Sequence, residues 1–254
     1  MRIKQAGGKS MGVLDVVKAY TPWAIRRASH RVKREVRWAR NARQPVSKVF
    51  EDVYNQSSWG GEQGKFYSGP GSDGNAARIY AQGIEAFLNE WNISSVVDLG
   101  CGDFRVASRF LNDEISYVGI DIVESLVHEN LAKHRSEKIS FACLDIIKDQ
   151  LPEGELCLIR EVFQHLSNAE ILEVMPKLRQ FRYVVYTDHQ PGPGARCIPN
   201  RDISHGVDTR IWLDSALFLD QPPFNADTQL LFETPASTNL RNPGEQLRTY
   251  LLRP

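Results

Sequence analysis

The stretch SSVVDLGCGDFRVASRF, residues 94–110, decides the fold expected for this chain. An apolar run ends beside Asp98, and Gly100 and Gly102 follow it closely. Glycines in such a place let the backbone turn sharply and approach a ligand, which is typical of the first strand-to-helix turn of a nucleotide-binding βαβ unit. We therefore expect a strand, a ligand-binding turn and then a helix over 104–111.

Downstream of residue 94, short β-branched runs alternate with helical patterns, including predicted helices at 124–135 and 168–179. This alternation is typical of a parallel sheet that is covered on both faces. Two late runs, 228–236 and 245–253, read as a closing pair of strands. We predict an α/β, Rossmann-like doubly wound fold: a mostly parallel seven-stranded sheet with helices on both faces and a basic helical N-terminal extension.

The composition is that of an ordinary globular protein, since 254 residues with 42% hydrophobic content can bury a full core. No run approaches the roughly 18 apolar residues that a membrane-spanning helix needs, and the N-terminus lacks the pattern of a secretory signal. We therefore expect a cytoplasmic protein. Four dispersed cysteines form no C-x-x-C pair, so we predict reduced thiols and no metal site: Cys101, Cys143, Cys157 and Cys197.

The net charge of zero hides an asymmetry along the chain. Residues 1–50 carry 13 Lys and Arg against Asp15 and Glu35, a net +11, which leaves −11 for residues 51–254. We predict a basic helical arm over 1–50 and one further domain over 51–254. In the arm, Thr21 and Pro22 read as an N-cap and first helical position, and a thin apolar stripe recurs at helical spacing: Ile25, Ala28, Val32, Val36 and Ala39.

Three roles for the arm stay open at this point. Its stripe can rest on the main domain as part of a solvated helix, or its arginines can bind an anionic membrane surface or the phosphates of a nucleic acid. An Arg-rich transit peptide is a further reading, which the Trp and Lys content weakens. The membrane reading implies peripheral association at the inner membrane face, and nucleic acid is the less favoured partner.

The turn after the first strand does not suit a dinucleotide. The third glycine of the dinucleotide fingerprint is replaced by Arg105, and Asp98 would repel a pyrophosphate. A ligand with a sulfonium, an amino group, a ribose and an adenine suits these residues better. Asp121 ends the next strand and can accept two bonds from ribose hydroxyls, while Asp145 can accept from an adenine amino group or can simply cap a turn.

The motifs VVDLGCGDF, YVGIDI and ACLDI resemble the three cofactor-binding motifs of the class I S-adenosylmethionine-dependent methyltransferases. The resemblance covers about residues 50–254. It implies S-adenosylmethionine as cofactor and S-adenosylhomocysteine as product. The cofactor-binding residues that it implies are Asp98, Gly100, Cys101, Gly102, Asp121, Ile122, Asp145 and Ile146.

A Gly-rich segment precedes the sheet, with six of the chain's 18 glycines in residues 60–74. We predict a cofactor lid over 57–75, in which Trp59 and Ser72 help to close the site, although an aromatic residue there can also be an anchor to the sheet. With NRDISHG and QPPF, this segment is similar to a bacterial methyltransferase subgroup that is associated with sugars, polysaccharide precursors and other small hydroxylated substrates.

Methyl transfer to a hydroxyl needs a base near the ends of the fourth and fifth strands. His165 is the first candidate because histidine titrates near neutrality, His189 is the second, and Glu161 is the third. Two alternatives are structural: His165 can satisfy backbone groups, and Arg160 can pair with Glu161 beneath the site.

The long connection over 189–227 holds five of the 13 prolines, and we predict that it is an ordered substrate cap. Its candidate substrate contacts are Asn200, Asp202 and Arg210.

We therefore expect an O-methyltransferase that acts on a small-molecule or glycan-type acceptor. An RNA methyltransferase that uses the basic arm and a non-catalytic S-adenosylmethionine-binding protein are the alternatives. The Asn- or Asp-Pro-Pro-aromatic run of enzymes that methylate nucleic-acid amino groups is absent, since REVF follows the fourth strand. The sequence leaves the oligomeric state open.

Overall fold

The computed structural model describes residues 23–236 and 244–254, with the backbone alone for residues 23–31. The chain divides between Arg40 and Asn41 into two compact units, ten residues before the boundary predicted from charge. Helix α2 (Trp23–Asn41) forms the described part of the first unit, and the predicted cap Thr21 and Pro22 lie outside the described residues. The second unit holds the sheet and its helices.

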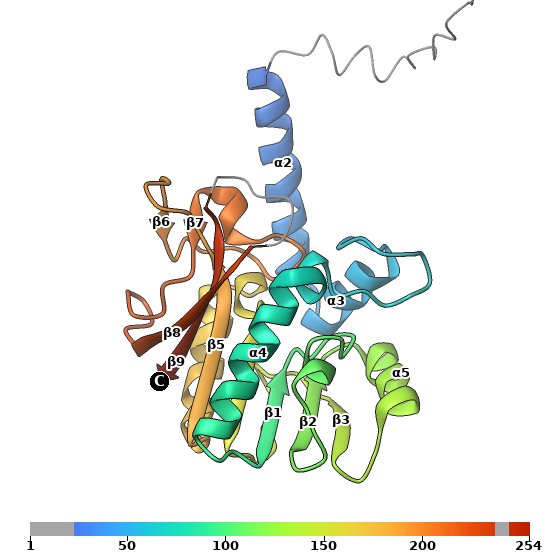
Figure 1. Cartoon of the computed structure of the whole chain (residues 1–254). Helices are drawn as coiled ribbons and strands as arrows, with labels where there is room; N and C mark the ends of the chain where they lie inside the picture. The colour runs from blue at the N-terminus through green and yellow to red at the C-terminus, as the bar shows by residue number, and fades with distance from the viewer. Residues whose placement is uncertain (1–22, 237–243) are drawn as a thin grey trace, which may run out of the picture. The chain divides into compact units, whose positions relative to one another are not determined.

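The second unit is built on a seven-stranded sheet with the order β3-β2-β1-β4-β5-β9-β8 (Figure 1). Strands β1 to β5 are parallel, and β9 runs antiparallel to both of its neighbours. This arrangement confirms the predicted doubly wound sheet and its closing strand pair. The strands are β1 (Ser95–Leu99), β2 (Ser116–Asp121), β3 (Ile139–Cys143), β4 (Leu156–Arg160), β5 (Tyr183–Gln190), β8 (Asp227–Pro235) and β9 (Gln246–Arg253).

Apolar side chains alternate along the central strands and feed a separate core on each face of the sheet. Val96 and Leu158 pack with α4 (Gly74–Glu90), whereas Val97 and Ile159 pack with α6 (Asn168–Val174). Strand side chains point to opposite faces in turn, so consecutive apolar residues in these strands supply both cores, because both faces of the sheet are covered.

The remaining helices are short. They include α3 (Val46–Asn55), α5 (Glu124–His134) and the 3₁₀ segments η1 (Pro70–Ser72), η3 (Phe163–His165) and η4 (Met175–Gln180), the last of which continues α6 where Pro176 lies. Ser167 and Glu170 form the expected capping box at the start of α6. Figure 1 shows α4 and α5 beside the parallel strands.

One predicted helix is wrong. Residues 104–111 form only a 3₁₀ turn, η2 (Ala107–Arg109), instead of an α-helix. Phe104 has φ +62°, which takes the backbone out of the right-handed helical region at the point where the helix would begin. The apolar residues of this segment are nevertheless buried: Phe104, Ala107 and Phe110 lie in the core that contains α4.

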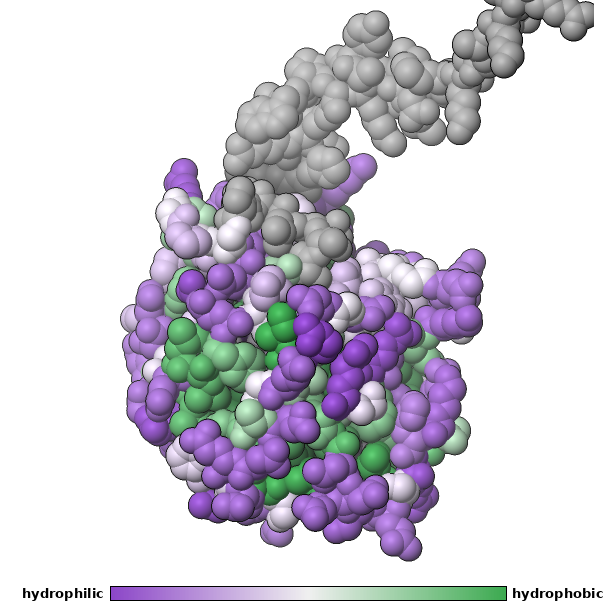
Figure 2. All heavy atoms as spheres, in the orientation of Figure 1, coloured by the Kyte–Doolittle hydropathy of each residue, from purple (hydrophilic) through white to green (hydrophobic). Residues whose placement is uncertain are grey.

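The connection over 189–227, called the cap below, is folded, and its contact with a substrate stays a prediction. It holds β6 (Ile198–Pro199) and β7 (Ser215–Ala216), which pair in parallel, and the 3₁₀ segment η5 (Arg210–Leu213). On the face drawn in Figure 2, polar side chains dominate the described surface and apolar ones break it in patches. In the second unit the exposed large apolar residues are Trp91, Leu172, Ile198, Trp212 and Leu230.

Within residues 23–236 and 244–254, no helix has the length and apolar character that crossing a bilayer requires. All four cysteines carry free thiols.

Candidate functional site

The turn after β1 requires both of its glycines. Gly100 and Gly102 have φ of +72° and +56°, in the left-handed region that glycine favours. A Cβ on Gly100 would lie 2.4 Å from Val162 Cγ2, and one on Gly102 would lie 2.2 Å from Ser68 Oγ. The turn is therefore a place where other segments come very close to bare backbone. Cys101, between the glycines, is half-buried.

Asp121 ends β2 and faces this turn. Its Oδ2 accepts from the backbone N–H of Gly102 at 3.1 Å, and its Oδ1 accepts from the N–H of Val123 at 3.1 Å. The backbone N–H of Ile122 also acts on this carboxylate, and since an ionised carboxylate has about four acceptor positions, Asp121 keeps capacity for at least one more donor. Burial raises the pKa of Asp121 to about 6, against the effect of these N–H groups.

Asp98 lies on β1, the neighbouring strand. It accepts from the hydroxyl of Tyr117 at 2.8 Å. Burial raises the pKa of Asp98 to about 6, although the Tyr117 hydrogen bond and the Arg160 guanidinium act in the opposite direction. Two desolvated carboxylates on adjacent strands make this edge of the sheet a favourable place for a cationic group.

Asp145 follows β3 and stabilises the turn there. Its Oδ1 accepts from the N–H of Ile147 at 3.0 Å, and its Oδ2 lies 3.2 Å from Lys148 Nζ. The predicted turn-capping role is therefore present, and the adenine contact stays a prediction. The N–H of Leu144 donates to the Asp121 carbonyl at 3.1 Å, which brings this turn beside the end of β2. Ile122 and Ile146 are half-buried and pack against the core.

The Gly-rich segment crosses this turn. Ser68 donates its N–H to Asp103 Oδ2 at 3.2 Å, and its Oγ accepts from the Asp103 N–H at 2.9 Å. The hydroxyls of Ser68 and Tyr54 are 3.0 Å apart. Sequence reasoning missed Tyr54 and Ser68 as site residues. No local pattern marks them, whereas Asp103 has a signal in its position directly after Gly102.

Arg160 ties the same segment to the end of β4. Its Nη2 donates to the Gly71 carbonyl at 2.6 Å, its Nη1 lies 3.0 Å from Glu161 Oε2, and its guanidinium lies 4.8 Å from the Tyr80 ring centroid. The predicted Arg160–Glu161 pair is present. Ser72 is buried and donates its hydroxyl to the Gly69 carbonyl at 2.7 Å, which stabilises the turn that Arg160 holds.

Glu161 adopts an unusual backbone conformation at this edge. Its φ is +55°, in the left-handed region that glycine favours, and such strain is concentrated at functional sites. Its N–H donates to the Thr187 carbonyl at 2.8 Å, and its carboxylate lies against Gly71, where a Cβ would be 2.2 Å from Oε2. The structure therefore places the third base candidate beneath the Gly-rich segment.

His165 lies between the Gly-rich segment and the cap. Its ring centroid is 5.2 Å from that of Trp59, and its Nδ1 is 3.0 Å from the Gly206 carbonyl oxygen. The Gly206 N–H donates back to the His165 carbonyl at 3.0 Å. Burial lowers the pKa of His165, although Glu161 and the backbone carbonyls of Gly206 and Asp208 act in the opposite direction.

His189, the second base candidate, ends β5. Its Nε2 lies 3.2 Å from Glu245 Oε2 in the residues that lead into β9. Its neighbour Asp188 accepts from the Tyr186 hydroxyl at 2.8 Å and from the His189 N–H at 2.8 Å, and burial raises the pKa of Asp188 to about 7. The ring of His189 therefore lies beside Glu245 at the sheet's antiparallel edge, and its Nε2 makes no hydrogen bond there within the described residues.

The three predicted substrate contacts lie in or beside the cap, and their polar groups are used within the protein. Arg210 is 1% exposed and donates to the carbonyls of Phe163 and Leu166. Asn200 accepts from the Phe218 N–H at 2.8 Å, and Asp202 accepts from the Asn168 N–H at 2.7 Å. These bonds give the residues a role in holding the cap, and contact with a substrate stays a prediction.

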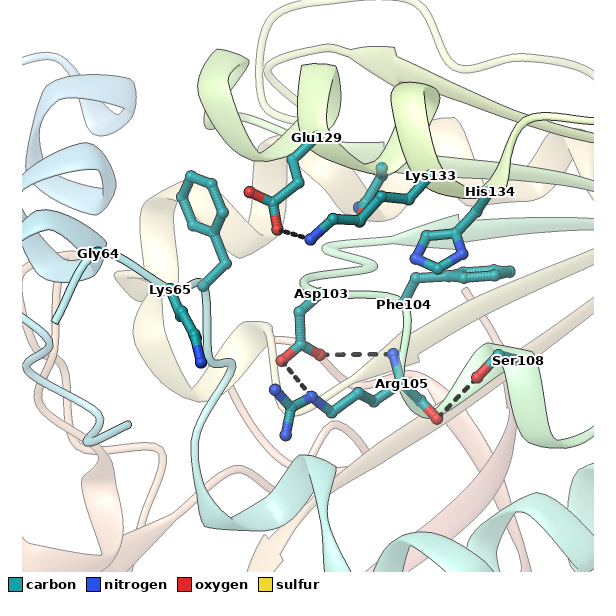
Figure 3. Close-up of a pocket in the computed structure, with 11 residues that line it drawn as sticks. Gly64, Lys65, Asp103, Phe104, Arg105, Ser108, Glu129, Lys133 and His134 are labelled. Atoms are coloured by element: carbon teal, nitrogen blue, oxygen red, sulfur yellow. Dashed lines mark hydrogen bonds and ion pairs between the residues drawn. The ribbon is translucent and has the colours of Figure 1, made fainter. Parts of the chain in front are cut away.

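A cavity of about 490 Å³ lies beside the Gly turn, between residues 64–66, 103–108 and α5 (Figure 3). Its Arg105 is paired with Asp103 at 3.0 Å and its Lys133 with Glu129 at 2.5 Å. The cavity touches the turn through Asn130, whose Nδ2 donates to the Gly102 carbonyl at 2.8 Å. Its lining excludes Asp98, Asp121 and His165.

Across the described ranges, no three His, Cys, Asp or Glu side chains are grouped in a way that could hold a metal ion.

No family model matches the sequence, and no curated protein matches it significantly. Among solved structures, magnesium protoporphyrin IX methyltransferase (ChlM) from Synechocystis PCC 6803 with bound SAM is 14% identical, covers 82% of this chain and 97% of its own, and has a TM-score of 0.51. The methyltransferase domain of bacterial CtHen1-C is 15% identical, covers 71% of this chain and all of its own (100%), and has a TM-score of 0.50. The chain therefore has the class I fold of S-adenosylmethionine-dependent methyltransferases.

Proposed function

We propose that this protein transfers a methyl group from S-adenosylmethionine to a hydroxyl of a small-molecule or glycan-type acceptor and releases S-adenosylhomocysteine. The observation that carries the proposal is Asp121, a buried carboxylate at the end of β2 that accepts from the Gly102 N–H and keeps capacity for a further donor. The fold of the SAM-bound protein described above supports the choice of cofactor.

The residues at this edge fit the proposed cofactor. Asp121 would accept from the ribose hydroxyls, and the bare backbone of Gly100 and Gly102, which Val162 and Ser68 approach closely in this structure, would border the cofactor. Asp98 would favour the cationic head, since a cation compensates a carboxylate whose pKa burial has raised to about 6. Asp145 and Ile146 would border the adenine. The cofactor supplies, when bound, an electrophilic methyl group on a sulfonium.

His165 is the proposed base. A carbonyl oxygen only accepts, so the bond to Gly206 favours a ring proton on Nδ1, although the backbone of Asp208 also forms a hydrogen bond with this ring. In the neutral ring Nε2 is then unprotonated and can take the proton of an acceptor hydroxyl. The lowered pKa of His165 keeps the ring neutral at pH 7.

The cap and the Gly-rich segment support a small acceptor. Both contact the residues around His165, through Gly206 on one side and Trp59 on the other. A glycan-type acceptor agrees with the subgroup that the Gly-rich segment resembles. No described contact favours RNA as the acceptor.

The experiment is a product search with methyl-labelled S-adenosylmethionine. The full chain is incubated with separate fractions of glycan precursors, lipids, RNA and small metabolites, and an Asp121→Asn variant is the control for background label. We expect label in a hydroxylated small molecule or glycan fraction. Label in RNA would overturn the acceptor class. Tight cofactor binding by calorimetry with no label in any fraction would favour a binding protein without catalysis.

A further inference from the structure

Helix α2 carries a strong positive charge of its own. Within its 19 residues, seven are basic and Glu35 is the one acidic residue. The basic residues are Arg26, Arg27, Arg31, Lys33, Arg34, Arg37 and Arg40. A charge of this density attracts an anionic surface, at about 1 kcal/mol for each Lys or Arg close to it.

The same helix exposes apolar side chains among its charges. Val32 and Val36 are one turn apart, so they share a face, and they are 62% and 65% exposed. Lys33 and Arg40 are also exposed, and at about 100° per residue they lie next to Val36 around the helix. One side of α2 therefore presents branched apolar groups that Lys33 and Arg40 border along one edge.

We infer that α2 binds the surface of a membrane that contains anionic lipids, lying in the plane of the interface. Helices with a basic face and an apolar stripe bind there because the stripe enters the boundary of the headgroups while Lys and Arg reach the phosphates. Nucleic acid would engage the same cations but would gain nothing from Val32 and Val36. The exposed valines therefore favour the membrane. This inference is independent of the acceptor and of methyl transfer.

The test uses the full chain and co-sedimentation with vesicles of phosphatidylcholine, either alone or mixed with phosphatidylglycerol. We expect binding to the mixed vesicles alone and its loss at high salt. Lys33→Gln/Arg40→Gln should weaken binding by about tenfold or more. Val32→Ser/Val36→Ser, which keeps the charge, should weaken it by about tenfold. Arg135→Gln/Lys138→Gln removes two exposed charges from the other unit as a matched control and should bind like the wild type.

Three results would overturn the inference. The first is equal binding to neutral and anionic vesicles, or none to either. The second is full binding by the valine variant, which would leave charge alone as the cause. The third is an RNA gel shift that requires Lys33 and Arg40 in a protein that does not sediment with vesicles. Calorimetry with S-adenosylhomocysteine checks that each variant is folded.

Discussion

Ser68 and Asp103 hold each other by two reciprocal hydrogen bonds, although 35 residues separate them in the chain. Each backbone N–H donates to the side chain of the other residue, at 3.2 Å and 2.9 Å. Because Asp103 directly follows Gly102, this pair fastens the Gly-rich segment onto the turn that would receive the cofactor. A ligand that binds at the turn would therefore lie beside the hydrogen-bonded pair of Ser68 and Asp103.

Ser68→Ala tests the fastening. The variant loses the bond from the Asp103 N–H and the contact with Tyr54, each worth about 1 kcal/mol. We expect faster proteolysis within residues 57–75 and a melting temperature that is lower by several degrees at most. Ser136→Ala, in the loop after α5, is the matched control. Unchanged cleavage would mean that other contacts, such as Arg160 with Gly71, keep the segment closed.

Asp121→Asn tests the ribose site. The substitution keeps the shape of the side chain and removes its charge, so the charge-assisted bonds of about 1.5 to 3 kcal/mol each are weakened. Calorimetry should show at least a roughly tenfold loss of S-adenosylmethionine affinity. Asp227→Asn, at an exposed aspartate on β8, should bind normally. Equal affinities in the two variants would remove Asp121 from the site.

The pH dependence of cofactor binding follows from Asp98 and Asp121. Burial raises the pKa of each to about 6, so both are ionised at pH 7 and take up protons as the pH falls through that value. Binding of a sulfonium should therefore weaken between pH 7 and pH 5, with proton release near pH 6. S-adenosylhomocysteine lacks the sulfonium and should lose less affinity. Parallel curves for the two ligands in calorimetry would contradict this.

His165→Gln tests the base. Loss of a general base commonly costs 10²- to 10⁴-fold in rate and leaves cofactor binding nearly unchanged. Because burial lowers the pKa of His165, the wild-type rate should fall only below about pH 6.5. His128→Gln, on the exposed side of α5, is the control. If His189→Gln loses turnover while His165→Gln keeps it, the base is on β5.

Asp188→Asn tests a buried carboxylate that the proposed chemistry does not use. Burial raises the pKa of Asp188 to about 7, above its value in the unfolded chain. Its protonated form therefore adds stability at low pH, and that contribution is lost as the pH rises through about 7. Chemical denaturation should show the wild type losing stability relative to the variant between about pH 4 and pH 7, by roughly 1.4 kcal/mol per pH unit, with no further loss at higher pH. A constant difference would place the charge of Asp188 in contact with water.

The sheet was predictable because its signals are local. Apolar runs that end in Asp98 and Asp121 reveal strands with both faces covered, and the glycines at 100 and 102 reveal the turn between them. The helix predicted at 104–111 failed because its apolar spacing is shared by a 3₁₀ turn that buries the same residues. In so short a segment, the apolar spacing indicates which side chains are buried, but it does not distinguish an α-helix from a 3₁₀ turn.

The contacts of the site were not predictable in the same way. Arg160 donates to the Gly71 carbonyl, 89 residues away in the sequence. Every residue has a backbone carbonyl, so the residue type at position 71 does not reveal this contact. The partners of Ser68 and His165 are likewise backbone groups or distant residues. Such contacts follow no regular spacing in the sequence, so they can be identified only in the folded structure.

His165 and Gly206 exchange two hydrogen bonds, and one of them favours the imidazole proton on Nδ1. Gly206 belongs to the cap, so a change in the cap that moves this carbonyl would weaken that preference. An acceptor that fits the cap would leave His165 Nε2 unprotonated and able to act as the base. An acceptor that distorts the cap would weaken this state of the ring and slow the transfer. Discrimination between acceptors would then appear in turnover more than in affinity.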